Sequence, residues 1–174
     1  MMRETRLFMV VMVAAALTAL GAPRPATAQE VWSGRTFFFE KGDFANPDLE
    51  ANQDRITDNV WITRDDLRGI YNIAQETSYT TNVSPVDTEW ATGDAVDYAT
   101  LTFQPWQLWH GSNPPGTVGV DACVHLITDD IYIDIRFESW TTSAGGGGFS
   151  YYRGREDTPV ERGTWSTIKA LYEN

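Results

Sequence analysis

The chain has 174 residues, with 24 acidic against 13 basic side chains and a net charge of −11. Nucleic acids and anionic membrane surfaces are bound through basic patches, so this balance argues against both as partners. The chain has one cysteine, so it cannot form an internal disulfide.

The first 28 residues have the pattern of a secretory signal peptide. Two arginines precede an uncharged apolar run, and the segment ends in Ala26-Thr27-Ala28, the small residues that a signal peptidase accepts. We predict cleavage between Ala28 and Gln29, which leaves a single domain, 29–174, with a net charge of about −13.

The same segment argues against a membrane anchor. Its apolar run is shorter than the ~20 residues of a spanning helix, and the lone cysteine, Cys123, is far from the position that lipidation requires. We therefore expect a secreted protein, periplasmic or extracellular, without membrane contact after cleavage. The apolar context of Cys123 predicts a buried thiol without a catalytic role.

Short segments rich in aromatic and β-branched residues follow one another after residue 28. They predict strands at 35–40, 59–63, 69–74, 99–103, 122–127, 131–137 and 148–153. The segment 131–137 alternates apolar and polar residues, as a half-buried strand does. The intervening Thr128-Asp129-Asp130 predicts a hairpin with an acidic turn.

This order of elements predicts an all-β fold, a single-domain β-sandwich of jelly-roll or related Greek-key type. Near the C-terminus, Trp165, Ile168, Leu171 and Tyr172 recur at helical spacing. We predict a short helix over 165–172, docked on the sandwich.

One segment is echoed along the chain: residues 56–62 match residues 127–133, identically or conservatively, at every position. An ancient duplication would place two acidic turns at equivalent sites. Two strands of one sandwich could equally have met the same turn-then-strand requirement independently. Both explanations stay open at this point.

Aromatic residues supply the first candidate site. All seven tryptophans follow residue 28, and Trp106, Trp109 and His110 flank a Gly/Pro loop. Exposed tryptophans can stack on sugar rings while neighbouring polar groups bind the hydroxyls. We take these three residues as a candidate carbohydrate-binding set.

Acidic turns supply the second candidate. The carboxylates of Asp54, Asp58, Asp129 and Asp130 are hard oxygen ligands that suit a structural Ca²⁺ ion. Ordinary turn chemistry explains the same residues. No motif of the chain requires a cofactor.

A third alternative is a secreted glycan-active hydrolase. Such enzymes use two carboxylates, and Glu89 with Asp87 or Glu138 offers a pair. Their spacing does not single them out, and we name no catalytic residue.

Four strings of the chain resemble a recurrent, uncharacterised β-rich module of exported bacterial proteins. They are NQDRITDNVW (52–61), SPVDTEW (84–90), VHLITDDIY (124–132) and GGFSY (147–151). The resemblance implies export and a modular role, and no activity. Together these patterns predict an exported, non-enzymatic binding or structural module, whose partner is an extracellular glycan or another exported protein.

Overall fold

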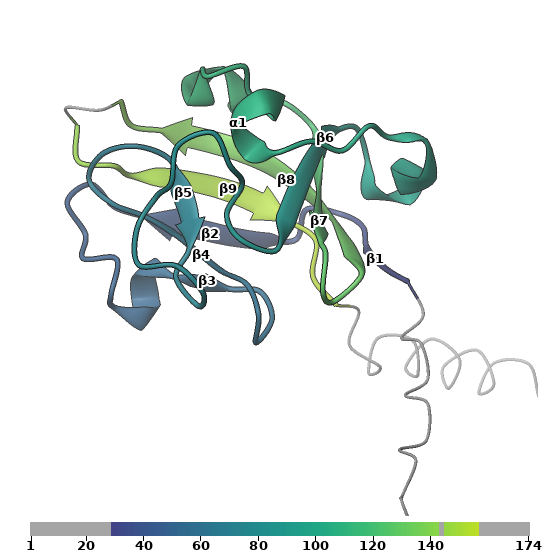
Figure 1. Ribbon diagram of the computed structural model, residues 1–174, viewed down its shortest axis with the longest axis horizontal. Helices are drawn as coiled ribbons and strands as arrows, with labels where there is room; N and C mark the ends of the chain where they lie inside the picture. The colour runs from purple at the N-terminus through teal and green to yellow at the C-terminus, as the bar shows by residue number, and fades with distance from the viewer. Residues whose placement is uncertain (1–28, 143–144, 157–174) are drawn as a thin grey trace, which may run out of the picture.

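A computed structural model describes residues 29–142 and 145–156, which form two β-sheets with short helical turns between them (Figure 1). The all-β class predicted from the sequence is confirmed. The predicted signal peptide (1–28) and the predicted helix 165–172 lie outside the described residues.

The larger sheet has six strands. Their order is β2 (Phe37–Lys41), β9 (Phe149–Arg153), β8 (Ile131–Trp140), β7 (Ala122–Leu126) and β6 (Thr88–Thr92), and β1 (Glu30–Trp32) pairs with β8 beside this path. The β1–β8 pair is parallel and the other pairs are antiparallel. The chain's first two described strands therefore lie against its last two.

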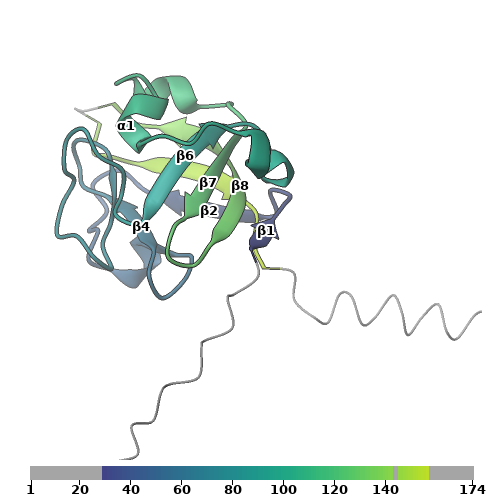
Figure 2. The same cartoon turned by 45° about the vertical axis from the view of Figure 1, so that its right-hand side comes forward.

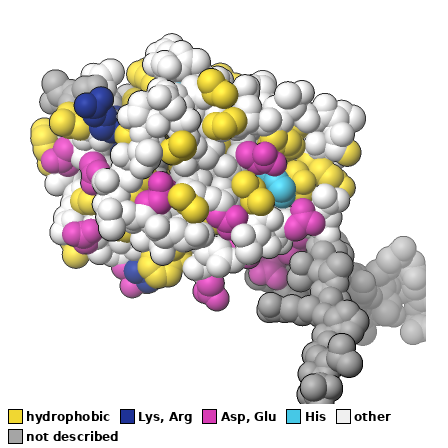
Figure 3. Space-filling view, viewed as in Figure 1, with side chains coloured by type: hydrophobic (Ala, Val, Ile, Leu, Met, Phe, Trp, Pro, Cys, Tyr) yellow, Lys and Arg dark blue, Asp and Glu magenta, His cyan; other side chains and the backbone are white. Residues whose placement is uncertain are grey.

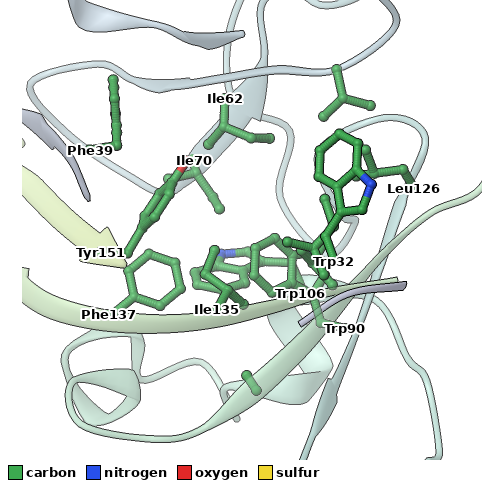
Figure 4. Close-up of a cluster of buried hydrophobic side chains, with 14 of the residues drawn as sticks. Trp32, Phe39, Ile62, Ile70, Trp90, Trp106, Leu126, Ile135, Phe137 and Tyr151 are labelled. Carbon is green, nitrogen blue, oxygen red and sulfur yellow. The ribbon is translucent and has the colours of Figure 1, made fainter. Parts of the chain in front are cut away.

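The smaller sheet has three antiparallel strands and packs on one face of the larger one (Figure 2). Its strands are β3 (Asp54–Arg55), β4 (Trp61–Arg64) and β5 (Ile70–Asn72). The main core lies between the sheets, where Ile62 and Ile70 meet Phe137 and Tyr151, and α1 (Trp106–Trp109) adds Trp106 (Figure 4).

Strand β8 shows why the sheet has two covered faces. Ile131, Ile133 and Ile135 point into the main core, as their alternation predicts. The opposite face, predicted to be exposed, is also buried at Tyr132 and Asp134. The 3₁₀ helix η2 (Ala95–Thr100) covers these two side chains, and its Tyr98 ring stacks on Tyr132 at a centroid distance of 4.2 Å.

A buried ion pair joins the two sheets. Arg153 of β9 donates from Nε and Nη2 to the two carboxylate oxygens of Asp54 on β3, over 2.7 and 2.8 Å. The Tyr151 hydroxyl donates to the same carboxylate over 2.6 Å. Both partners are at most 5% exposed.

The sequence predicted six of the nine strands that the described residues form. Residues 99–103 were wrongly predicted as a strand, because η2 and the extended chain after it occupy that stretch. Strands β1, β3 and β6 were not predicted, and neither were the short turns η1 (Glu50–Asn52), α1 and η3 (Pro114–Thr117). The jelly-roll or Greek-key assignment stays a prediction; the strands divide six and three.

Two further expectations concern Cys123 and membrane-spanning helices. Cys123 is fully buried, as predicted, and burial raises the pKa of its thiol to about 12. In the described part of the chain, no helix has the length and apolar character that a bilayer crossing requires.

Candidate ligand-binding site

The three residues of the predicted carbohydrate set lie in different environments. Trp106 is completely buried, with its ring packed edge-on to Trp90, so it presents no face to a ligand. Trp109 is half-buried, and its Nε1 donates to the Thr92 hydroxyl over 3.0 Å. His110 lines a pocket formed by residues of four stretches of the chain.

The four predicted calcium ligands are engaged separately. Asp54 is bound to Arg153 in the core. Asp129 accepts hydrogen bonds from the Thr57 hydroxyl (2.6 Å) and the Asn59 amide (2.7 Å). The remaining two are Asp130, which lies 3.4 Å from His125 Nε2, and the exposed Asp58. Among the described residues, no group of three His, Cys, Asp or Glu side chains is placed to hold a metal ion.

The carboxylates considered for hydrolysis also have separate partners. Glu89 lies 2.8 Å from His125 Nδ1, and Asp87 accepts from the backbone and hydroxyl of Thr128. Glu138 pairs with Arg136 on β8. Of the three carboxylates, only Glu89 lines one of the pockets described for this part of the chain.

The pocket beside His110 has a volume of about 360 Å³, a size typical of small-molecule sites. Four stretches of the chain form it: the end of β4 with the following turn to residue 69, residues 79–81, residues 107–115, and the end of β8 with Thr142. Arg64 and Arg68 are its charged side chains, and no carboxylate of the described residues lines it.

Arg64 is a cation buried in the pocket wall, with 1% of its surface exposed. Its Nε and Nη1 donate to the carbonyls of Arg68 (2.8 Å) and Gly148 (3.0 Å), and its guanidinium carbon lies 4.0 Å from the centre of the Trp140 ring. No ion pair joins it to a carboxylate of the described residues. Burial lowers its pKa to about 10, against the opposing effect of the Asp43 carboxylate, and this leaves it protonated at neutral pH.

Arg68 stands at the exposed side of the same pocket. Its φ of +78° lies in the left-handed region, which non-glycine residues seldom adopt and which costs free energy. In this conformation its carbonyl accepts the Arg64 Nε bond while its own guanidinium stays exposed. The two arginines are thus coupled through one backbone bond.

Gln107 is oriented by its neighbours. Its Oε1 accepts from the Tyr79 hydroxyl over 2.8 Å and from the Asn82 backbone N–H. With the oxygen occupied, the amide nitrogen is the group left to serve the pocket, and that nitrogen can only donate. The Tyr79 ring in turn lies across Gly69, where a Cβ would come within 2.5 Å of Tyr79 Cε2.

His110 ends α1 and lines the pocket with both ring nitrogens buried and without a hydrogen-bond partner among the described residues. Its ring packs edge-on to Trp106 at 4.8 Å. Burial lowers the pKa of His110, so the ring is neutral at pH 7. A neutral imidazole with unsatisfied nitrogens is a cost to the fold.

The site is therefore rich in hydrogen-bond donors and positively charged, within a strongly acidic protein. Acidic side chains are spread over the face seen in Figure 3, where Lys and Arg side chains are few. Such a pocket suits a ligand whose oxygens accept hydrogen bonds and carry negative charge.

Sequence reasoning identified one residue of this pocket, His110, and missed the two arginines, Gln107 and Trp140. Trp140, the last residue of β8, packs against the main core and also forms a pocket wall under Arg64. A signal was present in the chain, because Arg64 and Arg68 are two of only 13 basic residues and lie four positions apart. Asp65 and Asp66 between them made the segment look like an ordinary charged turn.

Comparison with protein families, characterised proteins and solved structures gave no match to this chain. The resemblance to an exported bacterial module stays a prediction.

Proposed function

We propose that the protein is an exported binding module that holds a small anionic ligand in the pocket beside His110. The observation that carries the proposal is Arg64, a buried guanidinium that has no carboxylate partner in the described residues. A buried charge without an ion-pair partner destabilises a fold. The Asp43 carboxylate acts on Arg64 from beyond salt-bridge distance and offsets only part of the cost of burial, since the pKa of Arg64 stays lowered. An anionic ligand would add the closer negative charge, with Arg68 as the second cation.

The same lining supports binding rather than catalysis. The pocket residues are arginines, amides, hydroxyls, aromatic rings, prolines and a histidine whose ring nitrogens are buried. This set can orient an anion but offers no accessible general base or nucleophile in a paired arrangement.

A matched pair of small probes tests the charge requirement. Benzoate and benzamide share a ring and differ in charge, and they can be titrated into the purified protein at constant ionic strength and followed by NMR. We expect benzoate to bind weakly, in the millimolar range typical of fragments, and benzamide to bind at least about tenfold more weakly, as expected for loss of a charge-assisted hydrogen bond.

Two variants of equal charge change locate the site. Arg68→Gln should weaken benzoate binding by about tenfold, whereas Arg155→Gln, which removes another exposed arginine outside the pocket, should leave it unchanged. Equal binding of benzoate and benzamide, or equal effects of the two substitutions, would contradict the proposal.

Export is a separate part of the proposal and rests on residues 1–28. Expression of the full chain in a bacterial host, followed by cell fractionation and N-terminal sequencing, tests it. We expect the protein outside the cytoplasm with Gln29 as its first residue. An intact N-terminus on a cytoplasmic protein would contradict it.

A further inference from the structure

We infer that the ligand is a sugar acid: a hydroxylated ring that bears a single carboxylate, as in a hexuronate, either free or at the end of an acidic glycan. This inference rests on the proposed anion-binding function and adds the chemical class of the ligand. Three features of the pocket carry it, beyond the charge of its arginines.

The first feature is the number of neutral polar groups around the cations. Gln107 presents its amide nitrogen, and Thr81, Ser112 and Asn113 line the same pocket with hydroxyl and amide groups. A bare carboxylate would use the arginines and leave these groups to water. Sugar hydroxyls both donate and accept, so they match such a mixed set.

The second feature is the wall on which a ring could rest. Pro114 and Pro115 form one apolar part of the lining, and the Tyr79 ring forms another. The absence of a side chain at Gly69 lets that ring approach the β4–β5 turn closely. Flat apolar surfaces suit the CH faces of a sugar ring.

The third feature limits the charge of the ligand. Arg64 commits N–H groups of Nε and Nη1 to carbonyls and is 1% exposed, so it acts on a ligand through its charge more than through a bidentate contact. The whole chain carries a net charge of −11, whose field opposes anions of high charge more than a single carboxylate. A monovalent acid therefore fits better than a phosphate or a polyanion.

Four probes separate the sugar-acid inference from the proposed anion binding: glucuronate, cyclohexanecarboxylate, glucose and inorganic phosphate. Cyclohexanecarboxylate keeps a ring and the charge of glucuronate but lacks the hydroxyls. Glucose keeps the hydroxyls but lacks the charge. Calorimetric titration of the purified protein should show glucuronate binding at least about tenfold more tightly than each of the others. A di- or trigalacturonate that binds more tightly than the monomer would assign the site to a glycan end, and equal binding would assign it to the free acid.

The outcomes distinguish failure of the sugar-acid inference from failure of the proposed anion binding. If cyclohexanecarboxylate equals glucuronate, or phosphate binds more tightly, the sugar-acid inference is overturned and anion binding stands. If glucose equals glucuronate, or no carboxylate binds, the proposed function itself is overturned.

Gln107 supplies the matched variant. Gln107→Met keeps the length of the side chain and the charge of the pocket but removes the amide donor. We expect glucuronate to lose most of its advantage over cyclohexanecarboxylate, while binding of the latter changes by less than about twofold. If the ratio of the glucuronate and cyclohexanecarboxylate affinities stays at its wild-type value, the Gln107 amide does not bind the sugar hydroxyls and that step of the inference is wrong. Because Gln107 also accepts two hydrogen bonds, Tyr79→Phe, which loses one of them without touching the donor, controls for local loosening.

Discussion

Asp54 shows how one carboxylate can define the relation between two sheets. Arg153 and Tyr151 together saturate it from the opposite sheet, and its side chain is 2% exposed. In the sequence the same residue was a candidate calcium ligand, because nothing in the order of residues brings Asp54 and Arg153 together. The pair is separated by 99 positions along the chain.

Removing this charge should be costly. Asp54→Asn leaves the Arg153 guanidinium buried without its counter-charge, and we expect the free energy of unfolding to fall by about 3–5 kcal/mol. Urea denaturation of the variant measures the loss. Asp58→Asn makes the same chemical change at an exposed side chain and should stay within about 0.5 kcal/mol of the wild type. Equal losses for the two variants would contradict this reading.

His110 should make the fold sensitive to acid. Its pKa in the folded protein is lowered by burial from the ordinary value of 6.5, so below that pH the unfolded chain takes up a proton that the folded protein does not. The free energy of unfolding therefore falls as pH falls below about 6.5, by at most about 1.4 kcal/mol per pH unit from this one group.

The variant His110→Phe removes this proton and the two unpaired nitrogens while keeping a flat ring against Trp106. At pH 8 we expect it to be more stable than the wild type by about 1 kcal/mol, because no buried polar atom is left unsatisfied. Its advantage should grow as the pH is lowered towards 5.5. Parallel pH profiles of the two proteins, measured by urea denaturation, would contradict the assignment.

At the scale of elements, the sequence predicted the strands that have the strongest alternation or the longest apolar runs. Strands β7 and β8 and the turn between them were predicted because every second residue of β8 from Ile131 to Phe137 is apolar and enters the core. Strands β1 and β3 have three and two residues, too few to show a period. The segment 99–103 has strand-like composition, but its neighbours in η2 bury Ala95 and Tyr98 against β7 and β8 instead.

The pocket was beyond sequence prediction for a physical reason. Its walls come from four stretches that are brought together only by the packing of the small sheet and α1 on the large sheet. In the chain, Arg64 follows Thr63 and precedes two aspartates, the pattern of a solvated charge. Its burial follows from the covering Trp140 and the carbonyl of Gly148.

The echoed segments meet in space. Thr57 and Asn59, in the turn between β3 and β4, both donate to Asp129, in the turn between β7 and β8. The turns are not equivalent, since five residues lie between the paired Arg55 and Trp61 and four between the paired Leu126 and Ile131. The two segments thus share a sequence pattern and contact each other, but their turns differ in length between the paired strand residues.

A double-mutant cycle measures this contact between turns. Asn59→Ala and Asp129→Ala should be non-additive, with a coupling energy of about 0.5–2 kcal/mol. Asp58→Ala, at the exposed neighbour, should show none with Asp129→Ala. Repeating the cycle in calcium and in EDTA tests the calcium prediction at the same residues, because a bridging ion would give a coupling that chelation removes.

At the scale of the whole molecule, net charge acts on stability as well as on ligand choice. A net charge of −11 on one small chain repels itself in the folded state. We expect the melting temperature to rise when salt is increased from a few millimolar to about 0.15 M, where the screening length is near 8 Å. The loss caused by Asp54→Asn should not change with salt, since the pair it breaks is buried. A melting temperature that falls with added salt would contradict the argument.

The pairing of β1 with β8 and of β2 with β9 has a consequence for when the protein can fold. Gly34 is held by Asp134, 100 positions later, and the β2 edge has no partner before β9 exists. A chain made from its N-terminus onwards therefore cannot close the larger sheet until nearly all of it has been synthesised. Until that moment its first strands lack their partners, and the export proposed above needs a chain that is still unfolded when it reaches the membrane.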